Sequence, residues 1–276
     1  MKMLFDYHVH SAFSDDSDYP LEQVIRDAVN MGLEEIAITE HVDYGVKAEW
    51  NEPVAPENTR MVRNVNYPAY FAMLKKLKEQ YAGKIRIKEG LEFGIQHHTI
   101  PKFEKLFAAC DLDFVIASCH QVEDKEFWTQ EFQTGRSQQE YNERYYEEIL
   151  RVVRSFDHYC VLGHLDSIKR YDNAGFYPFE KTREITAEIL KTAISRGHGI
   201  EVNTSTIRYG LPQWMPSWDI LELYKDLGGE ILTIGSDSHA PSHLGAYIQR
   251  CRGELKDRGF RYYCTFDKMQ PVFHNL

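Results

Sequence analysis

Short apolar runs alternate with amphipathic stretches along most of the 276-residue chain. Runs enriched in β-branched and aromatic residues are typical of buried strands. They predict strands at residues 3–8, 35–39, 84–91, 113–117, 159–162, 199–202 and 230–234. Between several of these runs, apolar residues recur at steps of three and four, which is the period of one helix face. Such stripes run through Tyr70, Leu74, Leu77 and Tyr81, through Ile185, Ile189, Leu190, Ala193 and Ile194, and through Leu244, Ile248, Cys251 and Leu255.

Local signals indicate where some helices begin. Ser137 and Glu140 have the spacing of a capping box, and Pro178 and Pro241 stand where helices could start. Strand and helix alternate about seven times, which predicts a parallel sheet with helices outside it. At this length a closed or nearly closed α/β barrel is favoured over an open sheet, so we treat residues 1–276 as a single domain.

Side chains that can bind metal ions follow nearly every predicted strand. In parallel α/β folds, ligands bind beyond the carboxyl ends of the strands. In chain order the strands are followed by His8, His10 and Asp15, by Glu40 and His41, by Glu92, by His120, by His164, by Glu201 and Asn203, and by Asp237 and His239. Residues i and i+2 of a strand point the same way, so His8 and His10 can direct two imidazoles to one point.

Each of these residues alone has an ordinary explanation. A His-x-His pair arises by chance, a lone Glu92 is typical of a solvated carboxylate, and Asp237 could cap a helix. Their convergence on one edge of the sheet favours a metal cluster instead, because zinc, iron and manganese bind imidazoles and carboxylates. The six histidines with Asp15, Glu92 and Asp237 make nine ligands. That set exceeds the needs of one ion and suggests two or three ions that share a bridging carboxylate.

Composition argues against several other classes of protein. The formal net charge of −10 and the pI of about 5.7 count against a surface for long nucleic acids. The five cysteines include no CxxC motif, so we expect free thiols in a reducing cytosol rather than disulfides. No apolar run is long enough to span a membrane, and candidate ligands occur so early that we expect no cleaved leader. We therefore expect a cytoplasmic protein with a small-molecule substrate and no nucleic-acid or membrane partner.

The ordered motifs HVH, ITEH, GLEF, SCH, GHLD and GSDSH resemble those of the PHP (polymerase and histidinol phosphatase) superfamily, and they span the chain from His8 to His239. The layout is most similar to the family's monofunctional histidinol-phosphate phosphatases. This resemblance implies a distorted, TIM-like (β/α) barrel of seven strands, with the active site at their carboxyl ends. It also implies three divalent metal ions, drawn from zinc, iron and manganese.

The resemblance further implies which residues hold each ion. The first ion would be held by His8, His10, Glu92 and Asp237, the second by Glu92, His120 and His164, and the third by Asp15, His41 and His239. Glu92 would bridge the first two ions, and some relatives have histidine where this chain has Asp15. A hydroxide held between these two ions would attack the phosphorus of L-histidinol phosphate. The products would be L-histidinol and phosphate, in histidine biosynthesis.

Further side chains are candidates for binding the substrate. Arginine and lysine bind phosphate oxygens, and those that follow strand ends are Lys169, Arg170 and Arg208. Arg60 and Arg63 are weaker candidates in the longest irregular stretch, residues 40–66. Aromatic residues that could line the pocket are Tyr44, Trp50, Phe127 and Trp128. A small cationic alcohol would suit an acidic rim made of Asp43, Glu49, Glu52 and Glu57.

Two other functions stay open at this point. A PHP-type nuclease, nucleotide phosphatase or phosphodiesterase would use the same ligand set. The negative net charge of the chain counts against a long nucleic acid as the substrate but not against a mononucleotide. A non-catalytic metal-binding module is the third hypothesis, although a competent residue fills every ligand position. A side-by-side comparison of phosphate esters would separate these functions.

Overall fold

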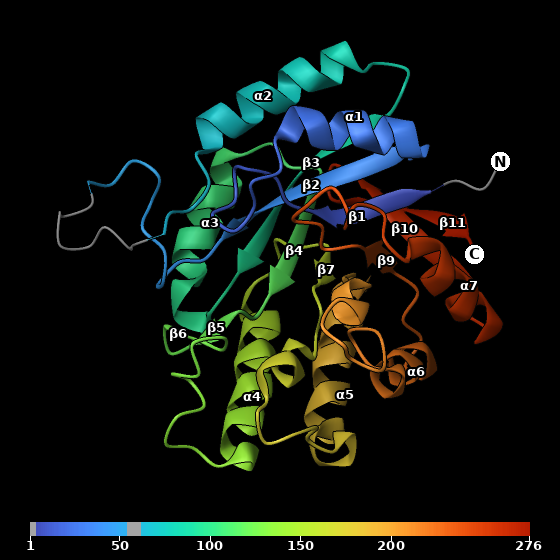
Figure 1. Cartoon of the computed structure of the whole chain (residues 1–276). Helices are drawn as coiled ribbons and strands as arrows, with labels where there is room; N and C mark the ends of the chain where they lie inside the picture. Colours follow the sequence, from blue (N-terminus) through green and yellow to red (C-terminus); the bar gives the residue numbers. More distant parts are fainter. Residues whose placement is uncertain (1–3, 54–61) are drawn as a thin grey trace.

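The computed structural model describes residues 4–53 and 62–276, and a seven-stranded parallel sheet lies at its centre (Figure 1). The strands are β1 (Phe5–Val9), β2 (Glu35–Val42), β3 (Arg86–Gly94), β4 (Phe114–Ser118), β7 (Val161–Leu162), β8 (Gly199–Asn203) and β9 (Leu232–Gly235). Their order in space, β1-β2-β3-β4-β7-β8-β9, is their order in the chain. All the predicted strands are confirmed, with ends that differ by a few residues. The predicted start at residue 3 lies outside the described residues.

Backbone hydrogen bonds bring the two edges of this sheet together. The N–H of His10 donates to the carbonyl oxygen of Ser238 at 2.8 Å, and the N–H of Ser238 donates to the carbonyl oxygen of His8 at 3.2 Å. Val9 and Ser238 form a parallel bridge at the same point. Because β1 thus meets the segment that follows β9, the sheet is a nearly closed, TIM-like barrel, which confirms the predicted fold class.

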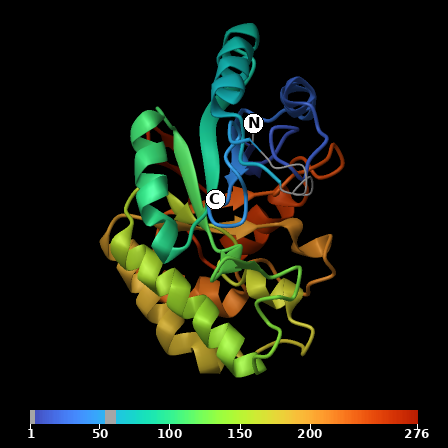
Figure 2. The ribbon, with the colours of Figure 1, turned by 90° about the vertical axis from the view of Figure 1, so that its left-hand side faces the viewer.

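Helices cover the outside of the barrel. They are α1 (Leu21–Met31), α2 (Tyr67–Gln80), α3 (Ile100–Ala109), α4 (Gln138–Ser155), α5 (Phe179–Ser195), α6 (Trp218–Asp226) and α7 (Ile248–Asp257), with short 3₁₀ helices η2 (His97–Thr99), η3 (Ser167–Tyr171) and η4 (Ser205–Ile207). Figure 1 shows α1 and α2 on one side of the strands and α4 and α5 on the opposite side. Figure 2 shows that α4 and α5 run side by side. Of the helices described, none is both long and apolar enough to cross a bilayer.

The predicted helix starts are right in two cases and wrong in the third. The N–H of Glu140 donates to the Ser137 hydroxyl at 3.3 Å, and the N–H of Ser137 donates to the Glu140 carboxylate at 2.7 Å, which completes the capping box of α4. Pro178 directly precedes α5. Pro241 starts no helix, because the turns that follow it lead to Tyr247, whose φ of +62° is left-handed. A right-handed helix cannot include that conformation, so α7 begins one residue later.

Two antiparallel hairpins were not predicted: β5 (Gln121–Val122) with β6 (Lys125–Glu126), and β10 (Tyr262–Asp267) with β11 (Gln270–Asn275). The second hairpin packs on the barrel through Phe266. Its ring centroid lies 5.1 Å from that of Phe114, the first residue of β4, and 6.4 Å from that of Tyr7. The N–H of Phe266 also donates to the Tyr7 hydroxyl at 2.8 Å. The hairpin therefore covers the amino end of the barrel, opposite the strand ends that carry the candidate ligands.

Candidate metal centre

Side chains from the carboxyl ends of the strands converge on Glu92, which is fully buried near the end of β3. Its Oε2 atom lies 3.2 Å from His8 Nε2 and 3.4 Å from His10 Nε2. Its Oε1 atom lies 2.9 Å from His164 Nε2 and 3.2 Å from His120 Nε2. His41 Nδ1 also lies 3.0 Å from Oε2. One oxygen of this carboxylate therefore faces three histidines and the other faces two, an arrangement that suits a ligand bridging two ions.

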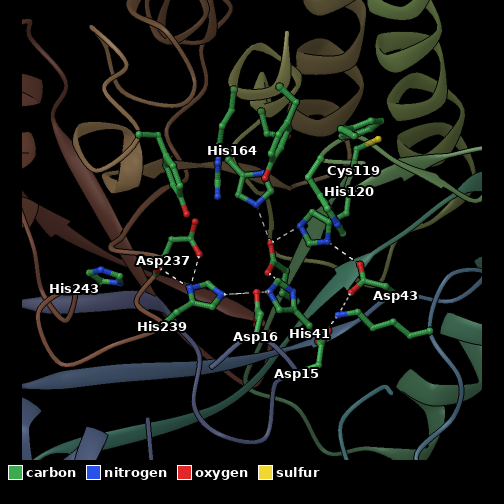
Figure 3. Close-up of a pocket in the computed structure, with 18 residues that line it drawn as sticks. Asp15, Asp16, His41, Asp43, Cys119, His120, His164, Asp237, His239 and His243 are labelled. Atoms are coloured by element: carbon green, nitrogen blue, oxygen red, sulfur yellow. Dashed lines mark hydrogen bonds and ion pairs between the residues drawn. The ribbon is translucent and has the colours of Figure 1, made fainter. Parts of the chain in front are cut away.

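A second cluster lies beside this carboxylate and contains Asp16 (Figure 3). Asp16 Oδ2 lies 3.4 Å from His41 Nε2 and 3.1 Å from His239 Nε2. The sequence analysis assigned this position to Asp15, but the structure does not bring Asp15 to these histidines. Asp15 Oδ1 instead pairs with Lys47 Nζ at 2.6 Å. Two aspartates are adjacent in the turn, and the buried ammonium group binds the first of them, which leaves the second for the imidazoles.

Asp237 follows β9 and joins the group around His8 and His10. Its Oδ1 atom lies 3.7 Å from the Nε2 atom of each histidine. The φ of Asp237 is +53°, a conformation that few residues other than glycine adopt. Arg208 supports it, because its guanidinium donates to the carbonyl oxygens of Asp237 at 2.7 Å and Ser236 at 2.9 Å. Arg208, a predicted phosphate ligand, is thus bound to the backbone that carries Asp237.

Several buried polar atoms at this centre have no hydrogen-bond partner among the described residues. They are His8 Nε2, His10 Nε2, His41 Nδ1, Glu92 Oε2 and His164 Nδ1. Burying such atoms without a partner is costly, so their convergence calls for a bound group. Within the described chain, sets of ligand atoms that all lie within 4.8 Å of one another are His8, His10 and Asp237; His8, Glu92 and His164; His41, Glu92 and His120; and His10, His41 and His239. This donor set fits divalent transition-metal ions.

Buried acids hold the outer ring nitrogen of two of these histidines. Glu201 Oε1 lies 2.5 Å from His8 Nδ1, and Asp43 Oδ1 lies 2.7 Å from His120 Nδ1. Because Nδ1 of each ring is engaged, Nε2 is left to face Glu92. Glu201 was noted at a strand end and Asp43 was placed on an acidic rim. In the structure both acids make the same kind of contact, which orients the ring of a candidate ligand.

The carboxylates and histidines of the centre shift one another's pKa values. Burial lowers the pKa of His8, but Glu201 and Glu92 outweigh burial and raise that pKa well above its usual value. Burial raises the pKa of Glu92, but His8 and His120 outweigh it and hold that pKa well below its usual range. Burial and neighbouring histidines lower the pKa of His10. The carboxylate of Glu92 therefore stays ionised, and its negative charge favours positively charged groups beside it. The lowered pKa keeps the imidazole of His10 neutral, which is the form that binds a metal.

The centre opens into a cavity of about 410 Å³, a size typical of small-molecule sites. Beside the candidate ligands, its lining includes the aromatic residues Phe127, Trp128, Tyr171 and Tyr209. Arg170 lines the cavity too, and its guanidinium carbon lies 3.2 Å from the centroid of the Tyr209 ring. Lys169 is engaged elsewhere, because its Nζ pairs with the Asp166 carboxylate at 2.7 Å and donates to the carbonyl oxygen of Trp214 at 3.1 Å.

The loop after β2 carries the remaining candidates. The guanidinium of Arg63 donates to the carbonyl oxygens of Glu49, Trp50 and Glu52 at 3.2, 3.1 and 2.7 Å. Arg63 therefore holds the loop together. Tyr44 is buried, and its ring centroid lies 4.7 Å from that of Phe103, so it packs in the core. Glu57 and Arg60 lie outside the described residues.

Comparison with known proteins decides the family. The PHP domain model matches residues 6–205. The chain belongs to the PHP family. It is 34% identical to the histidinol-phosphatase of Lactococcus lactis subsp. lactis (strain IL1403), over 98% of this chain and 96% of that protein. It is 27% identical to the probable histidinol-phosphatase of Thermotoga maritima, over 96% of this chain and 97% of that protein.

A solved PHP structure matches nearly the whole chain. It is the crystal structure of the histidinol phosphate phosphatase from Lactococcus lactis in complex with zinc, L-histidinol and phosphate. The TM-score is 0.84 at 33% identity, and the match covers 98% of each chain. The putative histidinol phosphatase of Listeria monocytogenes has a TM-score of 0.71 at 19% identity, which supports the fold alone.

Two features of this PHP site escaped the sequence analysis. Asp16 was visible as one of several acids in the turn after β1, but no local signal separates it from Asp15. Lys47 is nearly buried, and its Nζ lies 2.8 Å from Asp43 Oδ2 and 2.6 Å from Asp15 Oδ1. A lysine in a polar loop gives no sign of such burial, because Asp15 comes from another segment of the chain and Asp43, four residues away, is engaged with His120 from a third.

Proposed function

We propose that this PHP protein is a metal-dependent histidinol-phosphatase, which hydrolyses L-histidinol phosphate to L-histidinol and phosphate in histidine biosynthesis. The observation that carries the proposal is the position of Glu92 in a cavity of substrate size. Its Oε2 atom faces His8, His10 and His41, and its Oε1 atom faces His120 and His164. The similarity over nearly the full length to a phosphatase solved with zinc, L-histidinol and phosphate supports the choice of substrate.

The ligand sets support three divalent ions, drawn from zinc, iron and manganese. The first would be held by His8, His10, Glu92 and Asp237, the second by Glu92, His120 and His164, and the third by Asp16, His41 and His239. Asp16 takes the place that the family resemblance gave to Asp15, because its carboxylate is the one beside His41 and His239. When bound, such ions activate water and neutralise the charge on phosphoryl oxygens.

The chain's own residues would position and enclose the substrate. Arg170 lines the cavity and offers a planar set of donors that matches phosphate oxygens. Trp128, Tyr171 and Tyr209 line the same cavity and would exclude water from the leaving alcohol. The contacts of Lys169 with Asp166 and Trp214 count against such a role for Lys169. The five cysteines are unpaired, which agrees with the cytoplasmic location that we propose.

The experiment is a comparison of kcat/KM for L-histidinol phosphate, an aryl phosphate, a mononucleotide and an aryl diester, with zinc- or manganese-loaded protein. We expect L-histidinol phosphate to exceed the mononucleotide and the diester by about a hundredfold or more, which is about 2.7 kcal/mol of transition-state stabilisation. Higher kcat/KM for the mononucleotide or the diester would replace this proposal with the nucleotide phosphatase or phosphodiesterase alternative.

A further inference from the structure

Gly94, the last residue of β3, lies directly beneath the hydrogen bond that orients His120. A Cβ atom built on Gly94 would stand 1.8 Å from Asp43 Oδ1 and 2.8 Å from His120 Nδ1. These two atoms are the ones that form the 2.7 Å contact between the Asp43 carboxylate and the imidazole. The three nearest atoms to that Cβ all belong to these two side chains. Any side chain at Gly94 would therefore break this contact.

The backbone does not require glycine at this position. Gly94 pairs with Ser118 in the regular ladder between β3 and β4. Its φ is not among the positive values that favour glycine. Glycine inside a strand costs conformational entropy and gives up side-chain packing. The need for glycine at residue 94 therefore comes from the space above it.

We propose that Gly94 is a positioning residue, whose missing side chain leaves room for Asp43 to hold His120 with its Nε2 atom facing Glu92. The inference rests on the proposed metal centre but not on the identity of the substrate. Gly94 follows Glu92 by two residues, so the strand presents the bridging carboxylate and this open space on the same face. The strand β3 thus supplies the ligand Glu92 and also the space in which Asp43 orients the ligand His120.

The Asp43 carboxylate has little freedom to move aside. Its side chain is 2% exposed, and its Oδ2 atom lies 2.8 Å from Lys47 Nζ, whose side chain is 6% exposed. Its backbone N–H donates to Asn64 Oδ1 at 2.9 Å. Figure 3 shows the contact between Asp43 and His120 as a dashed line. A methyl group at residue 94 would therefore displace the imidazole or separate it from Asp43.

The same arrangement recurs at two other glycines around the centre. A Cβ on Gly235 would lie 2.5 Å from Glu201 Oε1 and 2.3 Å from His8 Cβ, where Glu201 holds His8. A Cβ on Gly163 would lie 2.4 Å from the Oγ atom of Ser118, which donates to Glu92 Oε1 at 2.6 Å. At three positions around the centre, a contact that orients a candidate ligand thus occupies the space that a side chain would fill if the residue were not glycine. This recurrence supports the assignment for Gly94.

The experiment measures zinc affinity of the full chain with a competing metal indicator, and zinc content by elemental analysis, for Gly94→Ala. We expect about ten- to a hundredfold weaker binding of one ion, the range typical when a contact that orients a ligand is lost. Gly253→Ala is the matched control, because Gly253 lies in α7, has no positive φ and has nothing within 4 Å of its Cβ position. It should bind zinc as the unaltered protein does. Wild-type zinc affinity in Gly94→Ala would overturn the proposal.

A double-variant cycle separates positioning from a general loss of structure. Asp43→Ala should weaken zinc binding by itself. Gly94→Ala should cost less in that background than in the unaltered protein, because the carboxylate oxygen at 1.8 Å is gone and the imidazole at 2.8 Å is free to move into its place. If Gly94→Ala does not fold but the double variant does, Asp43 is the obstructed group and the proposal stands. The proposal would be overturned if the two substitutions reduced zinc affinity by independent factors, so that the double variant showed their product. It would also be overturned if the double variant failed to fold. Zinc affinity decides these outcomes even if the unaltered protein releases no phosphate from L-histidinol phosphate.

Discussion

Asp16 Oδ2 lies 3.1 Å from His239 Nε2, so a carboxylate from the turn after the first strand meets a histidine that follows the last strand of the sheet. The two residues are brought together where the barrel closes, because the N–H of His10 donates to the carbonyl oxygen of Ser238 at the same junction. The proposed third ion site therefore exists only in the closed barrel. The contacts that close the barrel therefore also bring the ligands of this site together.

Asp16→Asn should remove about one metal equivalent per chain and lower kcat for L-histidinol phosphate, because Asn is a weaker ligand that carries no charge. Asp15→Asn is the matched control. The Lys47 ammonium group would still be paired with Asp43 at 2.8 Å, so Asp15→Asn leaves no unpaired buried charge. Elemental analysis and steady-state kinetics of the two variants check the assignment. Loss of metal in Asp15→Asn alone would return the role to Asp15.

Glu92→Gln should lower metal content by more than one equivalent and abolish nearly all turnover. The two carboxylate oxygens face different sets of histidines, so the amide should disturb two ions at once. Asp237→Asn should also abolish turnover but affect fewer ions, since the same oxygen, Asp237 Oδ1, makes its contacts with His8, His10 and His239. Circular dichroism checks that both variants are folded. A folded Glu92→Gln protein with normal metal content would rule out the bridging role.

Arg170→Ala should raise KM for L-histidinol phosphate, because Arg170 lines the cavity. A charge-assisted hydrogen bond contributes about 1.5–3 kcal/mol, or about ten- to 150-fold in kcat/KM. Lys169→Ala is the control, and its KM should stay near that of the unaltered protein because Lys169 contacts Asp166 and Trp214 instead. A larger effect from Lys169→Ala would contradict this assignment.

Arg208→Ala should behave differently from Arg170→Ala. Arg208 donates to the carbonyl oxygens of Ser236 and Asp237, so its loss should loosen the loop that carries a metal ligand. We expect lower metal affinity and lower kcat, with a smaller change in KM. A pure rise in KM at normal metal content would make Arg208 a direct phosphate ligand.

Much of this site was predictable because strand exits are local features of the sequence. The runs that end near His8 and Asp237 are short and mostly apolar, the run before Glu92 alternates apolar and charged residues, and parallel strands place their carboxyl ends at one edge. The i, i+2 spacing then fixes which side chains share a face. These two rules were enough to collect all the proposed ligands except Asp16.

The remaining features depend on contacts between distant segments. The choice between Asp15 and Asp16 is made by Lys47, which lies beyond the second strand. The β10–β11 hairpin is held by Phe266 against Tyr7 and Phe114, which lie far from it in the sequence. No periodicity in one segment can report such pairings, because tertiary packing decides them.

The most direct test of the account is the rate of phosphate release from L-histidinol phosphate before chelation, after chelation and after reloading with zinc or manganese. The candidate ligands include buried nitrogen and oxygen atoms that have no hydrogen-bond partner among the described residues. We therefore expect the chelated protein to be inactive. We also expect that activity returns only when more than one equivalent of metal per chain has been bound. Full activity after complete metal removal, or no phosphate release by the fully loaded protein, would contradict the assignment of this chain as a metal-dependent histidinol-phosphatase.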